Sequence, residues 1–221
     1  MFHKKTTLLF DLDGTITDPM IGITNSVKYA LKSFGIEVSN NKDLYKFIGP
    51  PLQESFKEYY NFNDIETDLA IKKYREYFSD KGIFENSLYT NMDLLLKSLK
   101  DNNKTIILAT SKPTISAEKI LKYFDILKYF DFVSGSTLDG SLSKKIDIIK
   151  YALSCNNITS LCDTIMIGDR KYDIVAAKEL GIDSIGVLYG YGDYEELTNA
   201  EATYIAKDIM ELSKLLNVPL Y

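Results

Sequence analysis

Short apolar segments that alternate with helix-like segments constrain the fold of this 221-residue chain more than any other feature. They are rich in β-branched residues and bounded by polar residues, which is typical of buried parallel strands. The stretches between them place apolar residues at helical spacing. We therefore predict an α/β fold with a parallel sheet flanked by helices. The predicted strands are TTLLFD (6–11), KTIILAT (104–110), FDFVSGS (130–136), DTIMIGD (163–169) and DSIGVL (183–188).

The interval between the first two predicted strands contains helical patterns and no convincing strand. A crossover between neighbouring strands needs only about a dozen residues, so the excess should form a separate body. We predict an all-helical cap subdomain over residues 17–85 and an α/β core formed by residues 1–16 and 86–221. Aromatic residues in the cap fall at helical spacing, which favours packing in its core over stacking on a ligand. The three helical patterns are 23–34, the segment after GPPL (49–52), and 65–78.

Carboxylates follow two of the predicted strands. Asp11 and Asp13 follow the first strand in LLFDLDGTITD, and Asp169 and Asp173 follow the fourth in GDRKYD. Ligands of open α/β sheets bind beyond the carboxyl ends of the strands. Helix capping is the alternative role for such residues. Two carboxylates one residue apart repel each other and cost free energy to desolvate, so the first pair indicates a bound cation or catalytic chemistry.

These groups suit phosphoryl transfer through a covalent intermediate. A carboxylate can act as a nucleophile, but its charge must be offset by a divalent cation and a lysine before a phosphate can approach. Carboxylate, phosphate and water oxygens suit Mg²⁺, which prefers octahedral coordination. Lys144 or Lys145 could supply the ammonium group. The Thr110 hydroxyl and backbone N–H groups around Gly14 and Ser111 could bind the phosphate oxygens.

Composition excludes several other classes of function. His3 is the only histidine, which removes Ser-His-Asp triads, phosphohistidine chemistry and His-rich metal sites. Cys155 and Cys162 are too few for a disulfide framework, and we expect both to be buried as small apolar residues. A net charge of −5 argues against a nucleic-acid surface. No apolar run approaches the about 20 residues of a membrane span, and no signal peptide is visible. We expect a cytoplasmic protein and, by default, a monomer.

The order and spacing of four motifs resemble those of the haloacid dehalogenase-like hydrolase superfamily. The motifs are DLDGT, ILATSKP, a downstream lysine and GDRKYD, and the similarity covers nearly the whole chain. The match is close to the phosphoglycolate phosphatase branch, in which a helical cap lies between the first two motifs. The segments IGPPLQESF and GIDSIGVLYGYGDYEEL look like a subgroup called 5′-nucleotidase-like. The resemblance implies a Rossmann-like core and Mg²⁺-dependent hydrolysis of a small phosphorylated metabolite, of the phosphoglycolate or nucleoside 5′-monophosphate class.

Carried over residue by residue, the resemblance makes Asp11 the nucleophile and Asp13 the general acid and base. Both also belong to the implied metal site, Asp13 through its backbone carbonyl. The remaining implied roles are Thr110 and Lys145 at the phosphoryl group, with Asp169 and Asp173 at Mg²⁺, the latter directly or through water.

Two other functions stay open. A phosphosugar mutase on the same fold would return the phosphoryl group to a sugar instead of water, and the lack of a histidine in the cap disfavours it. A receiver-like regulatory Mg²⁺-binding protein also carries carboxylates at strand ends, but such modules run to about 120 residues and lack a cap. Dehalogenases of the superfamily lack the second carboxylate of the first motif, so Asp13 favours phosphoryl chemistry.

Overall fold

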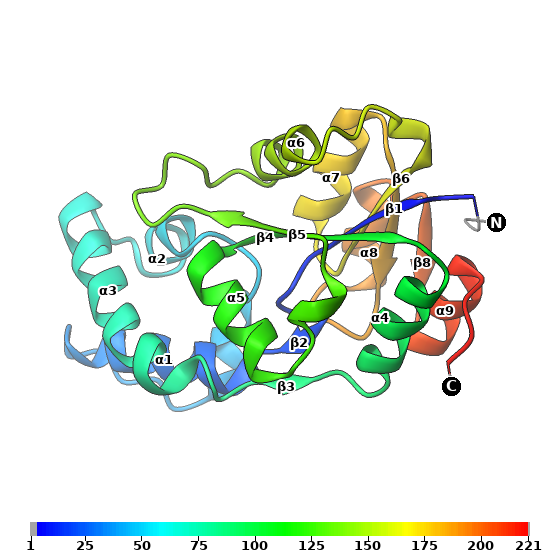
Figure 1. Ribbon diagram of the computed structural model, residues 1–221. Helices are drawn as coiled ribbons and strands as arrows, with labels where there is room; N and C mark the ends of the chain where they lie inside the picture. Colours follow the sequence, from blue (N-terminus) through cyan, green and yellow to red (C-terminus); the bar gives the residue numbers. More distant parts are fainter. Residues whose placement is uncertain (1–3, 221) are drawn as a thin grey trace. The chain divides into compact units, whose positions relative to one another are not determined.

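The computed structural model describes residues 4–220, so His3 lies outside the described residues (Figure 1). The chain divides into two compact units. Unit 1 consists of Met1–Asp18 and Leu88–Tyr221, and unit 2 consists of Pro19–Ser87. The cap limits predicted from the sequence, 17 and 85, each fall two residues before the limits of unit 2. A role for unit 2 as a cap stays a prediction.

Unit 1 is built on a six-stranded parallel sheet with the strand order β5–β4–β1–β6–β7–β8. The predicted α/β fold is confirmed, and all five predicted strands are present. The short edge strand β8 was not predicted. The strands are β1 (Thr7–Phe10), β4 (Thr105–Pro113), β5 (Phe132–Ser136), β6 (Thr164–Gly168), β7 (Asp183–Val187) and β8 (Tyr204–Ala206).

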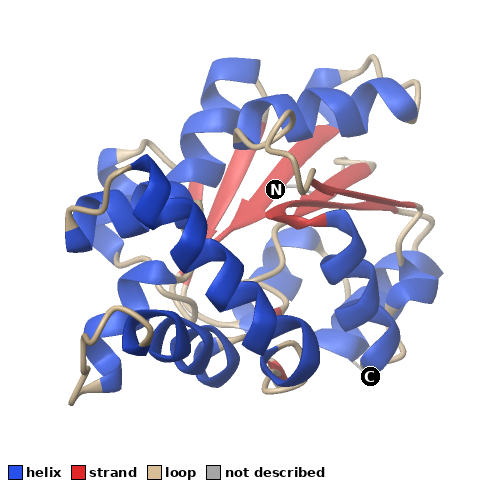
Figure 2. Ribbon diagram, turned by 90° about the vertical axis from the view of Figure 1, so that its left-hand side faces the viewer, coloured by secondary structure: helices blue, strands red, loops and turns tan. Residues whose placement is uncertain are grey.

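Helices cover both faces of this sheet, which forms the central layer of unit 1 (Figures 1 and 2). On one face, Leu9, Ile107 and Met166 from three neighbouring strands pack in one buried cluster with Ile148 and Ile149 of α6. Helix α7 lies on the same face, and α4 and α9 lie on the other (Figure 1). Burial on both faces explains why the strands read as continuous apolar runs. The helices are α4 (Met92–Asp101), α5 (Thr114–Tyr123), α6 (Lys145–Cys155), α7 (Lys171–Leu180), α8 (Tyr194–Asn199) and α9 (Ile209–Leu216), with 3₁₀ turns η3 (Leu127–Tyr129) and η4 (Leu161–Asp163).

Unit 2 is helical, with helices at the three places where the sequence predicts them. Its aromatic residues do form core contacts: the buried rings of Phe47 and Phe56 lie 5.1 Å apart edge to face, and Phe56 stacks on Phe62. The short strands β2 (Thr17–Asp18) and β3 (Ser87–Leu88) pair where the chain leaves and re-enters unit 1. The helices are α1 (Met20–Lys32), η1 (Asn41–Phe47), α2 (Leu52–Tyr60), α3 (Asp64–Tyr77) and the π-helical turn η2 (Phe78–Gly82).

The expectation that both cysteines are buried is wrong, because Cys155 and Cys162 are exposed. Cys155 is the last residue of α6, and Cys162 lies in the turn before β6, so neither faces the core. Across residues 4–220, none of the helices has the length and apolar character needed to cross a lipid bilayer.

Candidate active site

The loop of residues 11–18, here called the β1 loop, lies in unit 1 and contains the first two carboxylates, Asp11 and Asp13. The Asp11 N–H donates to the Ile167 carbonyl at 2.9 Å, which continues the pairing of β1 with β6 past the end of the strand. The loop then turns back, and the Gly14 N–H donates to the Thr17 carbonyl at 2.8 Å. Gly14 has φ +84°, in the region that favours glycine. The carboxylates of Asp11 and Asp13 are therefore both buried beyond the carboxyl end of the central strand.

Two buried lysines face these carboxylates. Lys145, the first residue of α6, places its Nζ 2.9 Å from Asp11 Oδ1 and 2.8 Å from Asp173 Oδ1. It also donates to the Ala109 carbonyl at 3.0 Å, whereas Lys144 is exposed. Lys112 places its Nζ 2.7 Å from Asp13 Oδ2. Each carboxylate of the first pair thus has a lysine of its own.

Asp169 follows β6 and is held tightly. The Tyr191 N–H donates to Asp169 Oδ2 at 2.8 Å, and the Thr15 hydroxyl lies 3.4 Å from Oδ1. A Cβ added at Gly14 would lie 2.1 Å from Asp169 Oδ2, so a side chain at that position would displace the carboxylate. The glycine of DLDGT is required here for close approach as well as for its backbone conformation.

Three carboxylates form a candidate metal site. One oxygen each from Asp11, Asp169 and Asp173 lie within 4.8 Å of one another, and all three residues are buried. The ammonium group of Lys145 pairs with Asp11 and Asp173. One positive charge among three carboxyl groups leaves the cluster with an excess of acidic groups. A hard divalent cation with oxygen ligands fits this donor set. The Asp13 carboxylate is outside the cluster because it pairs with Lys112, and its proposed metal contact through the backbone carbonyl stays a prediction.

Burial sets the protonation of the cluster. It raises the pKa of Asp169 well above its ordinary value, and the nearby charges of Asp11 and Asp173 raise it further. Burial also raises the pKa of Asp173 to about 6, although Lys145 opposes the shift. For Lys145 itself, burial lowers the pKa, but the carboxylates of Asp11 and Asp173 outweigh burial and raise it. Because burial and the neighbouring carboxylates both disfavour the ionised forms of Asp169 and Asp173, a bound cation would stabilise those ionised forms.

Two of the expected phosphate-binding residues, Thr110 and Ser111, lie at the end of β4. The Thr110 side chain is buried and Ser111 is half-buried. The register of β4 with β5 shifts between Thr110 and Pro113, so Ser111 and Lys112 lie in an irregularity of the strand. Sequence reasoning assigned no role to Lys112. A lysine two residues after Thr110 in ILATSKP was the available signal, but the irregularity that positions it cannot be read from the apolar pattern.

The profile of haloacid dehalogenase-like hydrolases matches residues 8–187. The chain belongs to this family. A 5′-nucleotidase of Pseudomonas aeruginosa is 37% identical over 213 residues, with 96% of each chain covered. A solved structure described as a predicted phosphatase from Clostridium acetobutylicum is 51% identical with a TM-score of 0.94, and the match covers 96% of this chain and 98% of that one. Tyrosine-protein kinase PtkA of Mycobacterium tuberculosis is 34% identical over 214 residues, which cover 96% of this chain and 72% of the kinase.

Membership of the haloacid dehalogenase-like hydrolase family confirms the family expected from the four motifs. It also confirms the expectation of an enzyme of the phosphoric monoester hydrolase class, in agreement with the relatives named as phosphatases.

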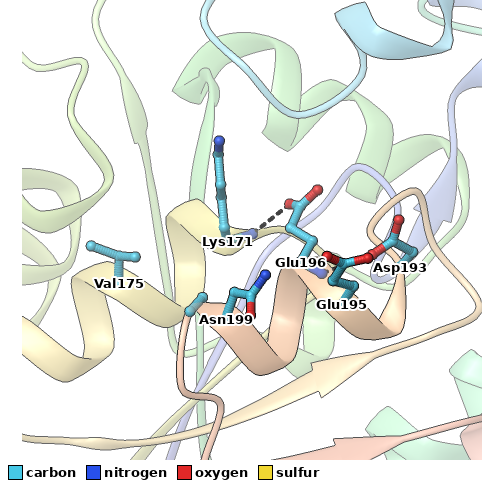
Figure 3. Close-up of a pocket in the computed structure, with 7 residues that line it drawn as sticks. Lys171, Val175, Asp193, Glu195, Glu196 and Asn199 are labelled. Carbon is cyan, nitrogen blue, oxygen red and sulfur yellow. Dashed lines mark hydrogen bonds between the residues drawn. The ribbon is translucent and has the colours of Figure 1, made fainter.

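A pocket of about 490 Å³ lies between α7 and α8 (Figure 3). Glu196 lines it but is already engaged: its carboxylate accepts from the Arg170 guanidinium at 2.9 Å and from the Lys171 N–H at 2.8 Å. None of the predicted site residues lines this pocket. Its lining residues are Lys171, Val175, Asp193, Glu195, Glu196, Asn199 and Ala200.

Proposed function

We propose that the protein is a Mg²⁺-dependent phosphatase that hydrolyses a small phosphomonoester through an aspartyl-phosphate intermediate on Asp11. The observation that carries the proposal is the buried cluster of Asp11, Asp169 and Asp173 around Lys145 at the carboxyl end of the parallel sheet. Such a site neutralises a phosphate while it offers a carboxylate as nucleophile. The relative named a 5′-nucleotidase supports a substrate of the nucleoside 5′-monophosphate class, with phosphoglycolate as the other candidate.

The proposed reaction has two displacements. Asp11 attacks the phosphorus, the ester P–O bond breaks, and Asp13 donates a proton to the leaving oxygen. Asp13 then accepts a proton from a water that attacks the same phosphorus, which breaks the aspartyl P–O bond, releases phosphate and restores Asp11. Burial raises the pKa of Asp13, which helps it hold the first proton, while Lys112 opposes the shift and favours the later ionised form.

Charge in the site is shared between the lysines and the cation. Asp169 and Asp173, together with Asp11, would hold Mg²⁺. When bound, the ion supplies positive charge that offsets the repulsion between the carboxylates and the phosphoryl oxygens. Lys145 keeps Asp11 oriented, and its positive charge beside the nucleophile would offset the negative charge of the incoming phosphoryl group. The Thr110 hydroxyl and the backbone around Gly14 and Ser111 complete the proposed phosphate contacts.

The test is phosphate release from a panel of nucleoside 5′-monophosphates, phosphoglycolate and sugar phosphates, with Mg²⁺ and with chelator. We expect one class to stand out in kcat/KM, loss of activity with chelator, and loss of turnover in Asp11→Asn. Asp93→Asn, which changes an exposed carboxyl group on α4, is the matched control and should behave as wild type. Full activity of Asp11→Asn would overturn the covalent mechanism.

The alternative reaction is transfer of the phosphoryl group to a hydroxyl group instead of to water. The relative named a tyrosine-protein kinase is the observation that favours it. The same assays separate the two. One phosphate released per substrate consumed supports hydrolysis, whereas consumption without phosphate release supports transfer to another hydroxyl or isomerisation.

A further inference from the structure

The segment Tyr189–Gly192, here called the tyrosine segment, follows β7 and is attached to the β1 loop through two hydroxyl groups. The Tyr189 hydroxyl donates to the Thr15 carbonyl at 3.0 Å. The Tyr191 hydroxyl donates to the Asp18 carboxylate. These two contacts lie on the part of the β1 loop that follows Asp13.

The same segment holds Asp169 from the other side. The backbone N–H of Tyr191 is the donor to Asp169 Oδ2. The flanking glycines let the chain approach closely: a Cβ at Gly190 would lie 2.3 Å from the Gly14 carbonyl oxygen and 2.4 Å from Asp169 Cβ. A Cβ at Gly192 would lie 2.0 Å from the Asp169 carbonyl oxygen. The tyrosine segment therefore contacts both loops that carry the candidate metal ligands.

Packing fixes the segment in this place. The Tyr89 ring lies edge-on to the Tyr189 ring, with 4.9 Å between their centroids. The candidate metal ligands Asp11 and Asp169 lie on separate loops, and the tyrosine segment contacts both loops. Groups outside the ligand shell that hydrogen-bond to metal ligands keep those ligands oriented. Removal of such a group commonly weakens the affinity of the site for the metal by about ten- to a hundredfold.

We propose that Tyr189 and Tyr191 are positioning residues of the metal site: their hydroxyl groups join the tyrosine segment to the β1 loop and so hold Asp169 at the distance from Asp11 that a divalent cation requires. The inference deepens the proposed function and rests on its metal site. It assigns these tyrosines an effect on cation affinity and none on the chemical step once the cation is bound.

The test measures Mg²⁺ binding to the whole protein by titration calorimetry, which needs no turnover. The double substitution Tyr189→Phe with Tyr191→Phe removes both hydroxyl contacts and keeps both rings. We expect the Mg²⁺ dissociation constant to rise about tenfold. Tyr189→Phe alone should give a smaller rise and serves if the double variant does not fold. Tyr194→Phe, at an exposed tyrosine on α8, is the matched control and should leave the constant unchanged.

Kinetics supply a second readout that a general loss of structure would not reproduce. At limiting Mg²⁺ the double variant should lose activity in proportion to its weakened binding, and at saturating Mg²⁺ its kcat should return to the wild-type value with an unchanged KM for substrate. Unchanged Mg²⁺ affinity in a folded variant, or a kcat defect that Mg²⁺ does not restore, overturns the inference and leaves the proposed function standing. Absence of Mg²⁺ binding by the wild-type protein overturns both.

Discussion

Lys145 is the residue on which the charge balance of the site depends most directly. Its ammonium group contacts the buried carboxylates of Asp11 and Asp173, so Lys145→Met removes the positive charge that pairs with both. Breaking a buried ion pair in this way costs about 3 kcal/mol or more of stability. Loss of a cation that faces transferring phosphoryl oxygens lowers kcat by about a hundredfold or more. Urea denaturation and steady-state kinetics check both effects.

The neighbouring Lys144 supplies the matched control for this change. It precedes Lys145 in the sequence and is exposed, so Lys144→Met should leave both stability and kcat near the wild-type values. Equal effects of the two substitutions would contradict the assignment of the phosphate-facing ammonium group to Lys145.

The raised pKa of Asp173 predicts a pH dependence of Mg²⁺ stabilisation. Its pKa is about 6 in the folded protein against an ordinary value of 3.8. Without metal, the folded state holds more protons than the unfolded chain between these values, so this group lowers stability as pH rises through the window. Mg²⁺ competes with those protons, and we expect it to raise the Tm more at about pH 7.5 than at about pH 5. Thermal unfolding with and without Mg²⁺ checks this, and equal increments at both pH values would refute it.

At the residue scale, the carboxylates and Lys145 could be predicted from the sequence, and the other side chains and backbone groups that contact the carboxylates could not. Asp11, Asp13 and Asp169 follow apolar runs directly, so the pattern alone places them at one edge of the sheet. Lys112 lies in the irregular part of β4 and reaches Asp13, and Tyr191 reaches Asp169 from the segment that follows β7. Such contacts depend on tertiary packing, and no local pattern carries them.

At the scale of elements, the sequence predicts long periodic segments well and short ones poorly. Helix α7 ends at Gly181 in the left-handed conformation, and a glycine directly after a helix is a common sequence signal of its end. Strand β8 has three residues, too few to show a period, and it escaped prediction. The cysteines were misplaced because residue type indicates average burial, whereas their exposure follows from positions at the end of α6 and in a turn.

Unit 2 depends on one close approach between two of its elements, α1 and η2. A Cβ at Gly22 would lie 2.0 Å from the Gly82 carbonyl oxygen and 2.9 Å from that of Glu85. Backbone atoms cannot rotate away, so Gly22→Ala must separate α1 from the turn, and we expect it to cost about 1–3 kcal/mol. Urea denaturation measures the loss. Lys32→Ala, at the exposed end of the same helix, should change stability by less than about 0.5 kcal/mol. A Gly22→Ala protein as stable as wild type would show that the contact is not needed.

At the scale of the molecule, the candidate site and the helical insertion belong to different units. Both lysines and all four carboxylates of the site lie in unit 1, whereas residues 19–87 form unit 2. The division is readable from the sequence because the interval between the first two strands is far longer than a crossover needs. The substrate is not readable, because related phosphatases share the phosphoryl end of the reaction and differ in what recognises the leaving group.

Removal of unit 2 would separate the chemical step, whose residues lie in unit 1, from the selection of the substrate. Strands β2 and β3 pair where the chain leaves and re-enters unit 1, so a short Gly/Ser linker can replace residues 19–86 and keep both strands. We expect the remaining chain to fold and to bind Mg²⁺ by calorimetry, because it keeps the sheet and the whole cluster. It should still hydrolyse a small activated ester such as p-nitrophenyl phosphate. If unit 2 acts as the predicted cap, which would exclude water and contact the leaving group, kcat/KM for the preferred metabolite should fall by about a hundredfold relative to that ester. An unchanged ratio would mean that unit 1 selects the substrate by itself, and specificity should then be sought around β4 and the tyrosine segment instead of in the helices of unit 2.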